Sequence, residues 1–116
     1  MAKDYKQLIA DVGAMTRKIR VEAPGTMDGF DAMAKASMAD GALSTGTKEL
    51  IALAIGVATR CDGCIGYHAK ALVRLGVPRA QLLEMLAVAT YMGGGPSLMY
   101  AADALRAYEQ FGGPAE

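Results

Sequence analysis

Two cysteines and one histidine lie close together in the stretch 60–76, RCDGCIGYHAKALVRLG, and their types and spacing are suited to chemistry. Cys61 and Cys64 are the only cysteines of the chain, and His68 is its only histidine. Residues three or four apart share one face of an α-helix. The three side chains can therefore point in the same direction.

This spacing favours thiol redox chemistry. We expect the cysteines to lie in a turn and at the start of the following helix, where free N–H groups and the helix dipole stabilise a thiolate. A thiolate can attack a peroxide oxygen, and a second cysteine can condense with the resulting sulfenic acid to form a disulfide. His68 can carry a proton to or from a sulfur or the leaving oxygen. Helix position alone leaves open which cysteine is attacked.

Metal binding and simple burial are the alternatives for these residues. A structural zinc site needs four ligands, so Glu49 or a neighbouring subunit would have to complete Cys61, Cys64 and His68. Covalent haem attachment is excluded, because Ile65 stands where the Cys-X-X-Cys-His motif needs histidine. We predict no metal and no cofactor.

Glu49 is the only acidic residue on an otherwise apolar predicted helix, twelve residues before Cys61. It is either a helix-start glutamate placed favourably in the dipole field or a carboxylate that orients His68 or accepts its proton. Twelve helical residues rise about 18 Å, and seven residues back along an antiparallel helix recover about 10 Å. Side chains, a water molecule or a tilt of the helices must bridge the difference.

The pattern E-x11-C-x2-C-x3-H, formed by Glu49, Cys61, Cys64 and His68, is preceded by KELIALA and overlaps YHAKALVRLGV. It resembles the alkylhydroperoxidase D-like branch of the carboxymuconolactone decarboxylase superfamily, over most of residues 40–108. The resemblance implies an all-helical subunit, homo-oligomers that are commonly trimers or hexamers, and an antioxidant thiol peroxidase acting on hydrogen or alkyl hydroperoxides.

The resemblance also implies roles for the residues. Cys64 matches the cysteine attacked by peroxide, Cys61 the resolving cysteine, and Glu49 and His68 the proton relay. A lipoyl-bearing or thioredoxin-like dithiol protein would reduce the disulfide. Members of the branch often carry a second histidine just before the second cysteine, where this chain has Gly63.

Two other functions remain open. The superfamily name allows decarboxylation of a small lactone acid, but members with that activity generally lack the cysteine pair, and the sequence has no cluster of arginines to hold two carboxylates. A non-catalytic protein that senses peroxide through the Cys61–Cys64 pair, or binds zinc there, is the third hypothesis.

Hydrophobic residues recur with helical spacing along the chain, and no segment alternates with the period of a β-strand. We predict an all-α fold, a compact bundle of about six helices in a single domain of residues 1–116, with the Cys-X-X-Cys motif on a helical hairpin. Phe30, Met33, Ala34 and Met38 are expected to face inward. We expect the helix over 48–59 to be buried and the helix over 80–92 to be mostly buried. The predicted helices span residues 4–20, 27–39, 48–59, 65–75, 80–92 and 97–111.

An internal similarity supports the hairpins. A shift of 32 residues lays 49–74 over 81–106 and aligns apolar residues with apolar residues at most helical positions. Cys64 then falls opposite Pro96, and proline after a glycine run is typical of a helix start. This register places Cys61 and Cys64 in the turn and at the start of a helix.

Charge and hydropathy restrict the class of partner. Twelve basic and twelve acidic residues cancel, so no broad positive field attracts nucleic acid or anionic lipid. The apolar run LIALAIGVA at 50–58 is too short to cross a bilayer, which takes roughly 20 residues. The first residues carry scattered charges unlike a secretory signal. We therefore predict a cytoplasmic protein that binds neither membrane nor nucleic acid.

Overall fold

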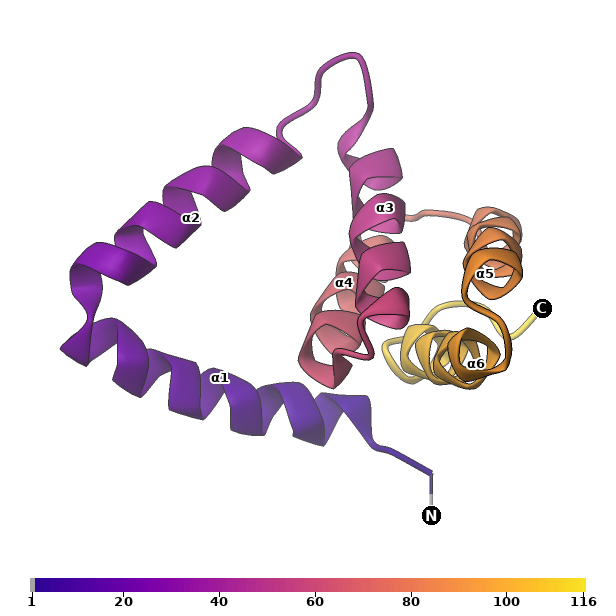
Figure 1. Ribbon diagram of the computed structural model, residues 1–116, viewed down its shortest axis with the longest axis horizontal. Helices are drawn as coiled ribbons and strands as arrows, with labels where there is room; N and C mark the ends of the chain where they lie inside the picture. The colour runs from indigo at the N-terminus through magenta and orange to yellow at the C-terminus, as the bar shows by residue number, and fades with distance from the viewer. Residues whose placement is uncertain (1) are drawn as a thin grey trace.

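Six helices account for nearly all of the computed structural model, which describes residues 2–116 and contains no β-strand within them (Figure 1). Residue 1, which belongs to the predicted domain, lies outside this range. The helices are α1 (Tyr5–Glu22), α2 (Pro24–Met38), α3 (Thr45–Ala58), α4 (Asp62–Arg74), α5 (Arg79–Gly93) and α6 (Gly95–Gln110). The predicted all-α fold is confirmed. No described helix has the combination of length and hydropathy that a membrane crossing requires.

Side chains at the helix starts explain several boundaries. Asp4 accepts a hydrogen bond from the amide of Gln7 and caps α1, and Ser44 accepts one from the amide of Thr47 and caps α3. The third helix therefore starts at Thr45, three residues before the predicted range of 48–59. Pro24 is the first residue of α2, where a proline loses no helical hydrogen bond. The second helix consequently starts three residues before the predicted range of 27–39.

The core lies between two helical hairpins, α3 with α4 and α5 with α6, and the first turns of α1 close it. Tyr5 reaches this core from α1 and is fully buried, and Tyr108 of α6 donates a hydrogen bond from its hydroxyl to the carbonyl of Val77 at 2.9 Å. The other large buried side chains are Leu53, Val57, Ile65, Leu72 and Leu82. The two hairpins predicted from the internal similarity are thus both present.

Helix α2 lies apart from this core. In Figure 1, α1 leads away from the body formed by α3 to α6 and α2 leads back towards α3, and none of the residues of α2 is buried. Phe30 and Met33 are 57% and 60% exposed, so their predicted inward orientation is wrong for the single chain. Ala34 is exposed too, and Met38 is half-buried. The reason is that α2 packs only against α1 and α3, whose contacts leave its apolar side uncovered.

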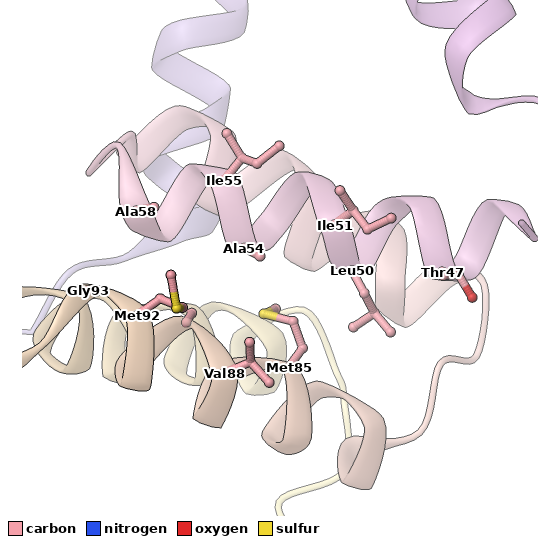
Figure 2. Close-up of a pocket in the computed structure, with 11 residues that line it drawn as sticks. Thr47, Leu50, Ile51, Ala54, Ile55, Ala58, Met85, Val88, Met92 and Gly93 are labelled. Carbon is pink, nitrogen blue, oxygen red and sulfur yellow. The ribbon is translucent and has the colours of Figure 1, made fainter.

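The expectation that 48–59 and 80–92 are buried helices is only partly correct. Each has one buried side, but Ile51 and Ile55 of α3 and Val88 and Met92 of α5 are exposed. These residues line an apolar groove of about 520 Å³ between α3 and α5, shown in Figure 2. No described helix covers this groove, which is why apolar residues all round these helices do not produce complete burial.

Candidate functional site

The turn between α3 and α4 brings the Cys-X-X-Cys motif directly to a helix start. The amide of Arg60 donates to the carbonyl of Val57 at 3.2 Å, and that of Cys61 to the carbonyl of Gly56 at 2.9 Å. These are the two hydrogen bonds of a Schellman motif, whose left-handed position is usually glycine. Here Arg60 occupies it with a φ of 57°. The chain therefore reverses within three residues, Thr59 to Cys61.

Cys61 and Cys64 form a disulfide at the amino terminus of α4. Cys61 is the N-cap residue, and its Sγ accepts a hydrogen bond from the amide of Cys64 at 3.2 Å. Cys64 is the third residue of the helix. The predicted position of the pair, in the turn and at the helix start, is confirmed. Both sulfurs lie where the helix dipole stabilises negative charge.

Gly56 allows α3 to approach α4 closely beside Cys64. It is buried, and a Cβ atom at this residue would lie 3.2 Å from the Cβ of Cys64. This spacing is tighter than most Cβ contacts, so α4 would have to give by a few tenths of an ångström at Cys64 to accept a side chain at this residue.

Glu49 and His68 make the second contact between α3 and α4 at this site. Oε2 of Glu49 lies 2.6 Å from Nδ1 of His68, within hydrogen-bonding distance. Glu49 is only 8% exposed, whereas His68 is half-buried. Burying a carboxylate is costly unless it is paired, so the contact with His68 explains how Glu49 is tolerated there. Of the two interpretations of Glu49, the one in which its carboxylate orients His68 therefore explains the burial of Glu49 better.

The distance that appeared too long from the sequence is shortened by the turn. Helix α3 ends at Ala58, and Gly56 rather than Cys61 lies opposite Cys64. From Gly56 to Glu49 is seven residues, a rise of about 10 Å, and from Cys64 to His68 is four, about 6 Å. The long side chains of Glu49 and His68 bridge the remaining gap directly.

The arrangement of the four predicted site residues suits thiol chemistry with proton transfer. The structure joins them in two pairs, Cys61 with Cys64 and Glu49 with His68. His68 follows Cys64 by one turn of the same helix, which places the imidazole on the side of α4 that carries Cys64. Gly63, the residue just before Cys64, lies near Val12 of α1. A Cβ atom at Gly63 would lie 3.9 Å from the side chain of Val12.

Asp62, inside the motif, has partners that sequence reasoning missed. Its Oδ1 accepts hydrogen bonds from Nζ of Lys3 and from the hydroxyl of Tyr5, both at 2.9 Å. Burial raises the pKa of Asp62, but the hydrogen bonds from Lys3 and Tyr5 outweigh it, so the pKa lies below its ordinary value. A carboxylate at a helix start is visible in the sequence and could have drawn attention to Asp62. Its partners Lys3 and Tyr5 could not be identified in this way, because they lie 59 and 57 residues away.

The larger cavities lie outside the cysteine site. None of the four predicted site residues lines the apolar groove between α3 and α5. A second pocket of about 530 Å³ between α1 and α4 is lined by three cations, Lys6, Arg17 and Lys70. No cluster of arginines was expected from the sequence, and the fold nevertheless gathers this mixed basic group from two helices.

In residues 2–116, no three His, Cys, Asp or Glu side chains are grouped so that they can hold a metal ion.

The fold and the site together define an all-helical protein with a Cys-X-X-Cys disulfide at a helix start and a buried carboxylate–imidazole pair. The model of the carboxymuconolactone decarboxylase family matches residues 24–107. The chain therefore belongs to the carboxymuconolactone decarboxylase family.

Known proteins are similar over most of the chain. An uncharacterised protein of Cupriavidus necator is 36% identical over 109 residues, covering 94% of this chain and 96% of its own. The uncharacterised protein 4 in the cox locus of Paracoccus denitrificans is 38% identical over 86 residues, 74% of this chain and 78% of its own.

Two solved structures share the fold. One is an apo family member from Legionella pneumophila, with 51% identity, a TM-score of 0.91, and coverage of 92% of this chain and 96% of its own. The other is a family member from Thermotoga maritima for which a role in an antioxidative response has been suggested. It has 24% identity, a TM-score of 0.78, and coverage of 88% and 87%, and this similarity establishes a common fold.

Proposed function

We propose that this chain is a thiol peroxidase that reduces hydrogen peroxide or alkyl hydroperoxides through a cycle of Cys64 and Cys61. The observation that carries the proposal is the combination of a Cys-X-X-Cys disulfide at the start of α4 with the Glu49–His68 contact one turn away. The disulfide is the expected resting product of such a cycle, and the carboxylate–imidazole pair is suited to moving its protons.

The cycle has three balanced steps. The Cys64 thiolate attacks one peroxide oxygen, the O–O bond breaks, and with one proton from His68 the products are a Cys64 sulfenic acid and an alcohol or water. The Cys61 thiol then attacks the sulfenic sulfur, forming the disulfide and releasing water. A dithiol donor finally reduces the disulfide to two thiols and is itself oxidised to a disulfide.

The choice of Cys64 as the attacked residue is supported by its neighbour. Cys64 precedes His68 by one helical turn, whereas Cys61 lies at the N-cap, outside the regular helix. Attack on Cys64 therefore places the developing alkoxide or hydroxide on the side of α4 that can receive a proton from the imidazole. Glu49 contacts Nδ1 of that ring, which leaves Nε2 to transfer a proton to the leaving oxygen.

Two partners belong to the proposal. The reductant is a dithiol protein, lipoyl-bearing or thioredoxin-like, acting in a reducing compartment such as the cytoplasm. The chain also forms a homo-oligomer, a trimer or a hexamer, and the support for this is the uncovered apolar surface of α2 and of the groove between α3 and α5 (Figure 2).

Consumption of peroxide in the presence of a small dithiol tests the proposal. We expect catalytic turnover by the wild type and loss of at least about 100-fold in Cys64→Ser, because the nucleophile is gone. Cys61→Ser should be oxidised once and then stall. Full activity in both serine variants would exclude the peroxidase, and one oxidation per chain without turnover in the wild type would indicate a sensor instead.

A further inference from the structure

The residues before α1 make a network with the Cys-X-X-Cys turn that the proposed cycle does not use. Nζ of Lys3 lies 2.9 Å from Oδ1 of Asp62 and 2.9 Å from Oδ2 of Asp103 of α6. The same ammonium group lies over the ring of Tyr100, 4.9 Å from its centre. Lys3 thus joins the first residue of α4 to the middle of α6.

The backbone around Lys3 is held in place from both sides. The side chain of Gln110, the last residue of α6, donates to the carbonyl of Lys3 at 2.8 Å and accepts from the amide of Tyr5 at 2.8 Å. Asp4 between them caps α1. Because these contacts fix the segment, the position of the ammonium group does not depend only on a long flexible side chain.

The charges favour this geometry over a wide pH range. Hydrogen bonds to Asp103 and then Asp62 raise the pKa of Lys3, and the pKa of Asp62 lies below its ordinary value. Burial first, and then the hydrogen bond to Asp62, raises the pKa of Tyr5, so that its hydroxyl stays a donor. Asp62 and Lys3 are therefore both charged at any pH where a thiol titrates.

The carboxylate of Asp62 is unfavourable for the cysteines. It is one residue from Cys61 and two from Cys64, and a nearby negative charge opposes the formation of a thiolate. Asp103 and Glu49 are the carboxyl groups that α6 and α3 contribute nearby, and Lys3 is the described cation that bonds to Asp62. Other charged or titratable groups on the surrounding elements include Tyr5 of α1, Arg60 of the turn, His68 of α4, and Tyr100 and Arg106 of α6.

We propose that Lys3 is a positioning residue of the cysteine site, which neutralises Asp62 and so keeps the reactive cysteine ionised near neutral pH. The purpose of this role rests on the proposed thiol function. The effect of Lys3 on the ionisation of the cysteine can nevertheless be measured without peroxidase activity. Sequence spacing gives no hint of it, because Lys3 and the cysteine motif are brought together only by the packing of α1 against α4 and α6.

The rate of alkylation by iodoacetamide as a function of pH tests this proposal on the reduced protein. We expect Lys3→Met to raise the midpoint of the alkylation profile by about 0.5 to 1 unit, which slows alkylation at pH values below the wild-type midpoint by about three- to ten-fold. Asp62→Asn should lower the midpoint by a similar amount. The double variant should lie near the wild type, because both charges are gone.

Two controls separate charge from structure. Lys3→Arg keeps the charge and should keep the midpoint, whereas a purely structural role would not be rescued. Lys18→Met removes an exposed cation of α1 that makes no described ion pair, and it should leave the profile unchanged. An unchanged midpoint in Lys3→Met, or an equal shift in Lys18→Met, would overturn the proposal. Alkylation needs no peroxide, so a wild type without turnover would count against the proposed function alone.

Discussion

At the scale of single residues, the pair of Glu49 and His68 distinguishes this site from an ordinary disulfide. In the sequence, Glu49 is the only acidic residue on an apolar helix and His68 is the only histidine of the chain. In the structure, Oε2 of Glu49 lies 2.6 Å from Nδ1 of His68, so the two residues form a pair. A buried carboxylate that touches the ring of a histidine holds the tautomer and orientation of that ring. The predicted catalytic contribution of Glu49 is therefore indirect and acts through His68.

Glu49→Gln tests this contribution, because it keeps the size of the side chain and removes its charge. We expect peroxide turnover to fall by about 10- to 100-fold with little change in the ability of Cys64 to be alkylated. Glu84→Gln, on an exposed position of α5, is the matched control and should keep full turnover. Equal activity of the two variants would remove Glu49 from the mechanism.

At the scale of the helices, local signals in the sequence were sufficient to predict the elements but not their packing. Capping by Ser44 and proline at the start of α2 are local, so the existence of these helices could be predicted, and the internal similarity placed the cysteines correctly. The partners of Asp62 could not be predicted, since Lys3 and Tyr5 reach it only through tertiary packing.

The close approach of helices is the other feature that the sequence left undetermined. A Cβ atom at Gly66 of α4 would lie 2.3 Å from Cγ2 of Ile9 of α1. No pattern of apolar residues distinguishes such a glycine from one on an open surface. Gly29 of α2, for example, has no neighbour within 4 Å of the same position.

These two glycines should respond in opposite directions to alanine. Gly66→Ala should lower the free energy of unfolding by about 1 to 3 kcal/mol, because α1 must move away from α4. Gly29→Ala should raise it by about 0.5 to 1 kcal/mol, because alanine favours the helix and meets nothing. Urea unfolding followed by circular dichroism, at equal protein concentration, measures both. A stable Gly66→Ala variant would contradict the observed α1–α4 contact.

At the scale of the whole molecule, the apolar surface exceeds what one chain covers. Phe30 and Met33 of α2 and Ile55 and Met92 beside the groove are each more than half exposed. Sequence reasoning assumed that such residues face the core of their own chain. The structure leaves them outside it, which is why the burial prediction was wrong for α2 and only partly correct for α3 and α5, while the prediction of the helices themselves was correct.

Light scattering coupled to size-exclusion chromatography tests whether other copies cover this surface. We expect a mass that is a small multiple of 12.1 kDa. Ile55→Glu places a charge in the groove and should shift the protein towards lower mass, whereas Gln81→Glu, on an exposed part of α5 outside the groove, should not. A wild type that remains a single chain at micromolar concentration would contradict the proposed assembly.

The mass of the Cys61→Ser variant after one equivalent of peroxide tests whether Cys64 is the residue that peroxide attacks. Without its resolving partner, Cys64 should gain one oxygen atom as a sulfenic acid, which a dimedone probe then captures on the peptide containing Cys64. We expect this adduct within the time of one turnover of the wild type. A Cys64 that remains an unmodified thiol under these conditions would exclude it as the residue attacked by peroxide.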